Sequence, residues 1–301
     1  TGHRQKPGPE GYRIGVAGNR VAVVGADPRG VLFGVGRLLR NLSLAPGSIR
    51  LDSAFRICTT PRHPIRGHQL GYRPINNTVE AWTYAQFDQY VRDLALFGAN
   101  AIEIMPGGTD DDDVKAALKS SAHCKIPGNW YHGKGWPLMR YSFMNALARH
   151  SQIIHSYGLD AWVWWPNMGK DYSDPACVKT ELAERDRTFR AMPHLDQLFV
   201  PGGDPGEVEP DLLFQWMGKV ARVLHKHHPK AGIWLSLQAF HQADSWIDTF
   251  VSHVKKNPPW LTGVAFSPWQ KTPLRELRRM IPARYPIRHY PDITHNINCQ
   301  Y

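Results

Sequence analysis

The sequence predicts an α/β protein, in which a small α+β domain over residues 1–60 precedes a TIM-type (β/α)8 barrel over residues 61–301, complete or incomplete in this chain. Two observations predict this fold class. From residue 64 onward, short apolar runs alternate with amphipathic segments, a pattern that builds a parallel sheet by right-handed crossovers. Before residue 60 the pattern is that of a strand pair followed by a helix.

The small domain is predicted from the stretch GYRIGVAGNRVAVVGAD, which reads as two alternating strands around a Gly-Asn turn. PRGVLFGVGRLLRNL follows with helical spacing of its apolar residues, and IRLDSAFRI returns as a strand. The Pro-rich segment TTPRHP (59–64) is the expected exit from this domain.

The barrel is predicted from seven apolar runs, each expected to form a strand. They cover residues 64–72, 100–106, 159–167, 195–203, 232–240, 261–269 and 286–292. Helical spacing is found between them, over residues 83–98, 139–158, 181–192, 210–228 and 244–256. The eighth strand of a barrel is not in the sequence, so the barrel is incomplete or irregular, or its chain continues. A doubly wound open sheet is the alternative fold.

Composition narrows the function classes. The 42% apolar and 21% charged residues are typical of a globular chain, and no apolar run reaches the roughly 18 residues of a membrane span. The net charge of +10 comes from scattered basic residues, so we expect no nucleic-acid partner, with polyanion binding as the alternative. The four cysteines form no CxxC pair. The sequence indicates neither the oligomeric state nor the true ends of the chain.

Polar and aromatic residues gather at the expected carboxyl ends of the strands, where barrel enzymes carry their chemistry. Carboxylates, amides and flat rings together suit carbohydrate, because sugars need polar partners for their hydroxyls and aromatic faces for their rings. The candidate residues outside the fourth strand's turn are Gln69, Glu103, Trp165, Asp171, Gln238, Trp269, His289, Tyr290 and Asp292.

Some of these residues have a second interpretation. Trp162, Trp164 and Trp234 fit the core as well as a sugar site, whereas Trp165 and Trp269, next to prolines, are better candidates for stacking. The stretch HYPDITH could suggest a metal site, but its spacing matches no zinc motif. We therefore expect no metal and no cofactor, and hydrogen bonds from this stretch to sugar hydroxyls.

The fourth apolar run ends in VPGGDPGE, a sharp turn that carries two carboxylates. Gly202 and Gly203 allow the backbone to turn tightly, and Pro205 fixes the next φ angle, so Asp204 is expected to point into the barrel mouth. The alternative is that Asp204 caps the next helix, although that helix starts near residues 209–211.

The small domain and the stretch TTPRHPIRGHQLGYR resemble family 20 glycoside hydrolases, the β-N-acetylhexosaminidases, over residues 11–73. The resemblance implies a zincin-like, non-catalytic small domain and sugar binding by Arg66. It also implies that Asp204 orients the substrate's 2-acetamido group as an internal nucleophile. Pro205 stands where the family has its acidic glutamate, so Glu207 is the nearest replacement acid, with Asp171, Glu103 and Asp292 as rivals.

These observations together predict an exo-acting glycosidase for a terminal β-linked N-acetylhexosamine or a related sugar. Asp204, Glu207 and Asp171 are its expected catalytic carboxylates, and an oligosaccharide or glycoconjugate is its expected substrate. By the resemblance, the protein is expected to be secreted or periplasmic. An α-glucuronidase-like hydrolase remains an alternative, since similar small domains precede those barrels. The other alternative is a non-catalytic carbohydrate-binding barrel, consistent with Pro205.

Overall fold

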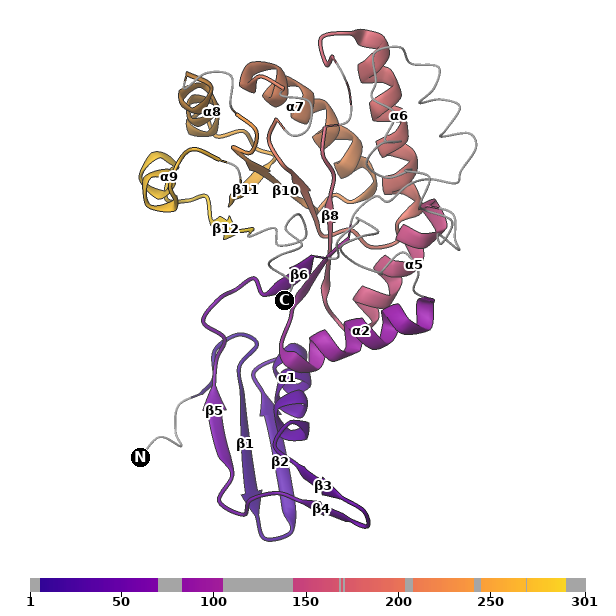
Figure 1. The fold of residues 1–301 in the computed structure, drawn as a ribbon, viewed down its shortest axis with the longest axis vertical. Helices are drawn as coiled ribbons and strands as arrows, with labels where there is room; N and C mark the ends of the chain where they lie inside the picture. Colours follow the sequence, from indigo (N-terminus) through magenta and orange to yellow (C-terminus); the bar gives the residue numbers. More distant parts are fainter. Residues whose placement is uncertain are drawn as a thin grey trace. The chain divides into compact units, whose positions relative to one another are not determined.

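The structure is a computed structural model that describes residues 6–69, 83–104, 143–167, 169, 171–203, 208–240, 245–268 and 270–290 (Figure 1). It divides into two compact units. The first contains Thr1–His68, Ala85–Ile102 and Ile153–Leu159, and the second contains Gln69–Tyr84, Glu103–Gln152 and Asp160–Tyr301.

The first unit is built around a three-stranded antiparallel sheet in the order β2-β1-β5. Its strands are β1 (Tyr12–Ala17), β2 (Arg20–Gly25) and β5 (Arg56–Thr59). Gly18 at the expected turn has a φ of +58°, which glycine adopts without strain. Helix α1 (Pro28–Leu39) packs on one face of the sheet, where Ile14 and Phe33 are buried. Asp27 caps the helix by accepting a bond from the Gly30 amide.

The strand predicted over residues 49–57 is divided in the structure. A short hairpin of β3 (Ser43–Ala45) and β4 (Ser48–Arg50) comes first, and β5 follows only at Arg56. The physical reason is the turn at Asp52, whose side chain accepts a 2.8 Å bond from the Ala54 amide and whose carbonyl accepts a 2.9 Å bond from the Phe55 amide.

The second sheet has seven parallel strands in the order β12-β11-β10-β9-β8-β7-β6, which curl into an incomplete barrel (Figure 1). One strand lies within each of the seven predicted runs, so the predicted barrel rhythm is confirmed. The strands are β6 (Gly67–Gln69), β7 (Ala101–Ile104), β8 (Asp160–Trp164), β9 (Gln197–Val200), β10 (Gly232–Ser236), β11 (Leu261–Phe266) and β12 (Ile287–His289).

The helices alternate with these strands along the chain. They are α2 (Tyr84–Phe97), α5 (Phe143–Ser156), α6 (Pro175–Ala191), α7 (Pro210–His227), α8 (Ser245–Lys255) and α9 (Leu274–Met280). Helix α6 begins six residues before its predicted start, because Asp174 caps it and Pro175 occupies the first turn. Helix α9 was not predicted. Within the described residues, no helix combines the length and apolarity that a membrane span requires.

The strand register sets which side chains share the inner face of the curled sheet. Trp164 pairs with Phe199, and Phe199 pairs with Trp234. Farther along, Ala265 pairs with Arg288. Because side chains alternate along a strand, residues two apart lie on the same face. Trp162 therefore also lies on this face, and the site described next is built on it.

Candidate functional site

A buried ion pair lies inside the curled sheet and joins its two ends. Arg288 on β12 donates to both carboxylate oxygens of Glu103 on β7, with Nη1–Oε2 and Nη2–Oε1 distances of 2.5 and 2.9 Å. The side chain of Gln69, at the end of β6, donates a third bond of 2.6 Å to Glu103 Oε1. The structure thus brings the predicted Gln69 and Glu103 together, around an arginine that the sequence analysis missed.

Aromatic rings surround the Arg288 guanidinium. Its central carbon lies 4.6 Å from the ring centroid of Trp162, 5.0 Å from that of Phe199 and 5.6 Å from that of Tyr290. Such contacts stabilise a cation that has lost part of its water. Tyr290 is only 3% exposed, and its ring meets the edge of Phe199. Trp162, Trp164 and Trp234 are all buried, as their core interpretation requires.

Several buried polar atoms near the strands' carboxyl ends have no hydrogen-bond partner in the described part of the chain. Gln69 Oε1, Trp162 Nε1, Gln238 Oε1 and Ser267 Oγ share this property. Buried polar atoms are nearly always paired, so unsatisfied groups that lie on or just after β6, β8, β10 and β11 are able to bind a polar ligand. Amide oxygens and an indole N–H match hydroxyl and acetamide groups in hydrogen-bonding character.

The turn after β9 is held tightly against its neighbours. Gly202 has a φ of +56°, and a β-carbon there would lie 2.3 Å from the carbonyl oxygen of Ser236. Gly203 donates its amide to the carbonyl of Gln238, at 3.1 Å. Only glycine fits this approach, which confirms the sharp turn that the sequence predicts before residue 204.

Asn167 ties the end of β8 to the same turn. Its side chain is fully buried, and its Nδ2 donates a 2.5 Å bond to the carbonyl oxygen of Gly202. Its Oδ1 accepts a 3.1 Å bond from Trp216 Nε1 on helix α7. Both ends of the amide are therefore satisfied, and the turn is fixed from two neighbouring elements.

A second buried ion pair braces the segment before Asn167. Arg185 and Glu181 on helix α6 form a 2.6 Å pair, and both side chains are at most 1% exposed. Arg185 also donates to the carbonyl of Pro166, and Tyr172 donates to Glu181. Burial, together with the charge of Glu181, raises the pKa of Tyr172 well above its ordinary value. These bonds hold the loop that positions Asn167.

Four of the predicted site residues lie outside the described residues. They are Asp204, Glu207, Trp269 and Asp292. On either side of the segment 204–207, Val208 donates its amide to the carbonyl of Gly203 at 3.3 Å. The cap of helix α7 is Glu209, which accepts a bond from the Leu212 amide, so this helix does not need Asp204 as its cap.

Asp171 lies in the loop before helix α6, and its side chain is exposed. Its Oδ1 accepts bonds from the amide and the hydroxyl of Ser173, at 2.8 and 2.6 Å. These bonds form a local turn that leads into the Asp174 cap. His289 is exposed as well, beside the ring of Phe266, while Gln238 is 1% exposed.

Trp165 occupies a different place from the one expected. It is 2% exposed, with Arg185 4.7 Å from its ring centroid and Phe189 at its edge. It therefore packs under helix α6 rather than facing a sugar. The reason is the alternation of side chains: Trp162 and Trp164 point to the inner face, and the next residue points outward.

Two comparisons by sequence find no relative: no protein-family model and no curated protein matches the chain. Solved structures do match. A β-N-acetylhexosaminidase from Bacteroides fragilis has a TM-score of 0.63 and 13% identity, over 93% of this chain and 61% of that one. A family 20 β-N-acetylglucosaminidase has a TM-score of 0.53 and 14% identity, over 81% and 62%. The chain has the fold of family 20 glycoside hydrolases.

The same fold extends to a family 89 glycoside hydrolase from Clostridium perfringens, with a TM-score of 0.58 and 11% identity. That match covers 90% of this chain and 37% of the other. The chain therefore spans about three fifths of the length of the two hexosaminidases named above and less of the family 89 enzyme.

Arg66 departs from the role that the family 20 resemblance implies. It precedes β6, and its Nη2 forms a 2.7 Å ion pair with Glu10, while Nε and Nη1 donate to the carbonyls of Gly98 and His63. The whole guanidinium is thus engaged inside the first unit. We leave Arg66 out of the proposed site. In the described part of the chain, no cluster of His, Cys, Asp or Glu could hold a metal ion.

Proposed function

We propose that this protein is a glycoside hydrolase that removes a terminal N-acetylhexosamine by carboxylate chemistry at the carboxyl ends of the barrel strands. The fold supports this proposal, and so do the names of its structural neighbours, which include β-N-acetylhexosaminidases. The unsatisfied buried atoms Gln69 Oε1 and Gln238 Oε1 support a polar, hydroxyl-rich ligand.

One observation carries the proposal: the turn after β9 is held by close backbone packing and by a buried side-chain hydrogen bond. Gly202 is packed against Ser236, and its carbonyl is held by the buried amide of Asn167. A carboxylate that follows such a turn has a fixed starting point, which is what catalysis by positioning requires. Asp204 is that carboxylate in the sequence.

In this proposal Asp204 orients the substrate's 2-acetamido group or stabilises the oxocarbenium-like transition state. Glu207 protonates the leaving oxygen, because Pro205 cannot. Asp171 is the second choice, since its carboxylate already accepts two bonds from Ser173. Glu103 serves as a fixed partner of Arg288 and not as an acid, because three donor atoms keep its carboxylate occupied.

The linkage is left to experiment. The family 20 neighbours are β-specific by name, whereas a family 89 neighbour has GlcNAc-α-1,4-galactose as its substrate. N-acetylglucosamine is common to both names, so the proposed substrate carries an N-acetylhexosamine, and the test below compares the two anomers.

The test is hydrolysis of 4-nitrophenyl glycosides of both anomers, with N-acetylglucosamine, N-acetylgalactosamine, glucose and glucuronic acid. Turnover of an N-acetylhexosaminide above the others supports the proposal. Preference for the glucuronide moves the assignment to an α-glucuronidase-like enzyme. Binding of N-acetylglucosamine without turnover of any substrate would mark a carbohydrate-binding barrel.

The acid is then assigned by comparing leaving groups. Loss of a general acid slows cleavage by roughly 10²–10⁴-fold for a poor leaving group such as an alkyl alcohol, and far less for 4-nitrophenol. Glu207→Gln should give this difference between leaving groups, and Asp171→Asn should not. If Asp171→Asn gives it instead, the two roles exchange.

A further inference from the structure

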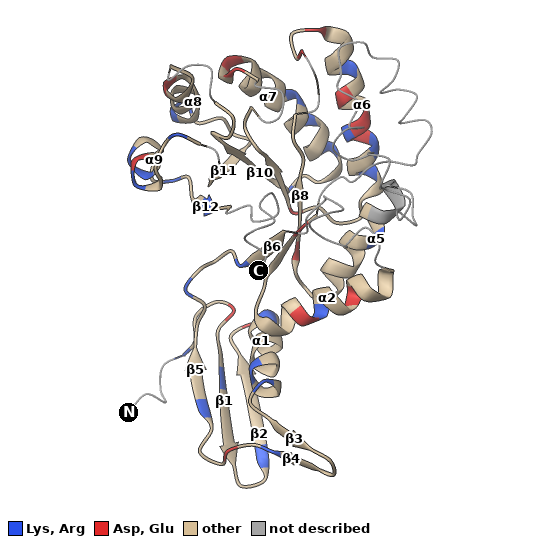
Figure 2. Cartoon of the chain, viewed as in Figure 1, with Lys and Arg blue, Asp and Glu red and all other residues tan. Residues whose placement is uncertain are grey.

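The basic residues are scattered along the sequence, but acidic residues are few at its start, so the first 68 residues carry most of the chain's net charge. They contain eleven Lys and Arg but three Asp and Glu, which gives +8 of the chain's +10, whereas the other 233 residues hold 25 against 23. Figure 2 shows the basic residues on β1, β2, β5 and α1. A charge this uneven is a physical reason to look for an anionic partner.

The three acids of this segment do not neutralise the sheet. Glu10 pairs with Arg29 and Arg66, and Asp27 caps helix α1. Asp52 accepts a bond from the Ala54 amide in a local turn. The cations on the sheet therefore face solvent without a carboxylate partner among the described residues of this segment.

Among the described residues, helix α1 packs on one face of the three-stranded sheet, and most side chains of the other face are exposed. Strand β1 alternates between the two, with Ile14 buried toward α1 while Arg13 is exposed. The register places Arg13 between Val24 and Cys58, and Gly15 between Ala22 and Arg56. We call these six residues the open face.

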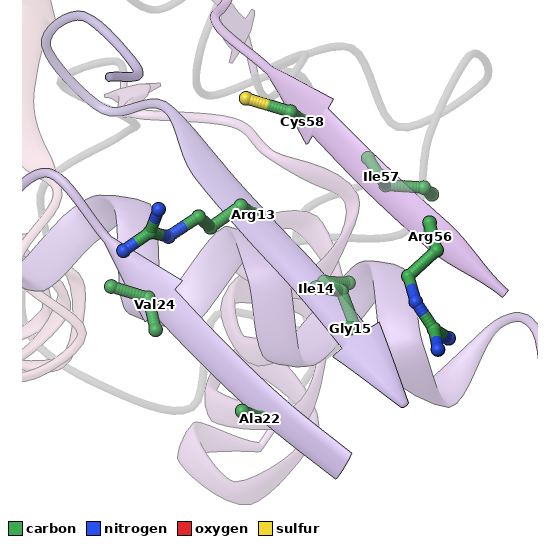
Figure 3. A pocket seen from close by; sticks show the side chains of 8 residues that line it. All are labelled: Arg13, Ile14, Gly15, Ala22, Val24, Arg56, Ile57 and Cys58. Carbon is green, nitrogen blue, oxygen red and sulfur yellow. The ribbon is translucent and has the colours of Figure 1, made fainter. Parts of the chain in front are cut away.

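The open face holds a shallow depression of about 300 Å³. In Figure 3, Arg13 and Arg56 come from neighbouring strands, with the small residues Gly15 and Ala22 beside them. Diagonal neighbours on adjacent strands lie about 7–8 Å apart, and the two arginine side chains extend in opposite directions in Figure 3, so an extended anion with separate charged groups can reach both. Within the described part of the chain, Arg56 Nη1 donates to the carbonyls of Ser53 and Phe55, and no carboxylate compensates its charge.

We propose that the open face binds an acidic polysaccharide, through carboxylate or sulfate groups that Arg13 and Arg56 clamp. Arginine forms paired hydrogen bonds with such groups, and the small Gly15 and Ala22 let a flat chain approach the sheet. The site goes beyond the proposed hydrolase activity. Binding of the polymer to the open face does not rest on the proposed function.

Other anions fit the open face less well. Single-stranded nucleic acids need aromatic rings on which bases stack, and none of its six residues is aromatic. Binding to an anionic membrane by charge needs a cluster of roughly four to eight Lys and Arg. The open face carries two arginines, so a polymer with regularly spaced charges is the better match.

The test is elution of the full chain from immobilised heparin by a salt gradient, with pectate binding measured alongside. Arg13→Gln with Arg56→Gln should lower the affinity at least about tenfold and reduce the salt slope by about two, one for each lost contact. Arg37→Gln with Arg50→Gln removes the same charge from α1 and β4, and should change both quantities little. Circular dichroism checks that each variant is folded.

A conservative pair, Arg13→Lys with Arg56→Lys, should keep most of the binding and guards against a folding artefact. Equal losses in the two Gln pairs, or no retention of the wild type, would overturn the proposal. Tighter binding to oligo-dT or to phosphatidylserine vesicles than to heparin and pectate would overturn it as well. Asp204→Asn should bind heparin and pectate like the wild type. The binding result can therefore be interpreted even if the proposed hydrolase activity is not found.

Discussion

Arg288 and Glu103 are 185 residues apart in the chain, yet they form a two-bond ion pair inside the incomplete barrel. The pair joins the last strand to the second, across the side on which a complete barrel would be closed by further hydrogen bonds. The two side-chain bonds between Arg288 and Glu103 thus replace part of the backbone hydrogen bonding that closes a complete barrel.

Removal of one partner should therefore destabilise the fold strongly. Arg288→Met leaves Glu103 buried without its cation and should cost about 3–5 kcal/mol in the free energy of unfolding, measured with urea. The double variant with Glu103→Leu should lose less than the two single variants together. Arg92→Met, which breaks an exposed pair with Asp88, should cost about 1 kcal/mol or less. Equal costs for Arg288→Met and Arg92→Met would contradict this account.

Gly202 gives a prediction with a close internal control. Gly202→Ala and Gly47→Ala both place a β-carbon on a residue with a φ near +60 to +70°, which costs about 1–2 kcal/mol. At Gly47 nothing lies within 4 Å, whereas at Gly202 the Ser236 carbonyl is 2.3 Å away. Gly202→Ala should thus lose about 1–3 kcal/mol more in thermal unfolding. Similar losses at both positions would show that the turn is not tightly packed.

Asn167 should act on activity through the position of the turn. Asn167→Ala leaves the Gly202 carbonyl and the Trp216 indole without their partner, at about 1–3 kcal/mol for each buried group. In the folded fraction, kcat should fall by roughly 10²-fold, with a smaller change in KM, as for other small misplacements. Asn41→Ala, which removes a surface bond to the Arg37 carbonyl, is the control. An unchanged kcat would argue against a positioning role.

The raised pKa of Glu184 leads to a specific prediction for how the stability of the fold depends on pH. Burial, and next the charge of Glu181, raise its pKa from 4.5 to about 7. The folded state thus holds this proton more tightly than the unfolded state does. The contribution of protonated Glu184 to the free energy of unfolding is therefore full below pH 4.5. It is lost as the pH rises from 4.5 to about 7.

Glu184→Gln should remove this decline, measured as the melting temperature at pH 4.5 and pH 7.5. Asp186 is the control with the opposite sign. Its hydrogen bond from His227, supported by Arg190 and Lys226, lowers its pKa, so its stabilisation is lost only as the pH falls below about 3.8. Asp186→Asn should leave the decline between pH 4.5 and 7 intact. A decline that persists in Glu184→Gln would contradict the assignment.

The sequence predicted strands β7 to β11 well because each is a largely apolar, buried run. The outer strands β6 and β12 have three residues each, and their positions followed from the regular alternation of strands and helices. It predicted the turn at Gly202 because a glycine pair followed by proline permits little else. Shorter features escaped: the strands of the β3-β4 hairpin have three residues each, too few to show a period.

The site was predicted less completely, for two physical reasons. A shift of one residue along a strand turns a side chain to the opposite face, which is why Trp165 packs under α6 while Trp162 faces inward. Arg288 was missed because its partner, Glu103, comes from the far end of the sheet, and no local pattern links the two.

The most direct test of the central claim is the rate at which the wild type and Asp204→Asn cleave the preferred N-acetylhexosaminide, at equal concentrations of folded protein. The account predicts measurable turnover by the wild type, and a kcat at least about 10²–10³-fold lower in the variant, as when a group that stabilises the transition state is removed. Equal turnover by the two proteins would contradict it, because the chemistry would then lie away from the turn that Gly202 and Asn167 hold in place.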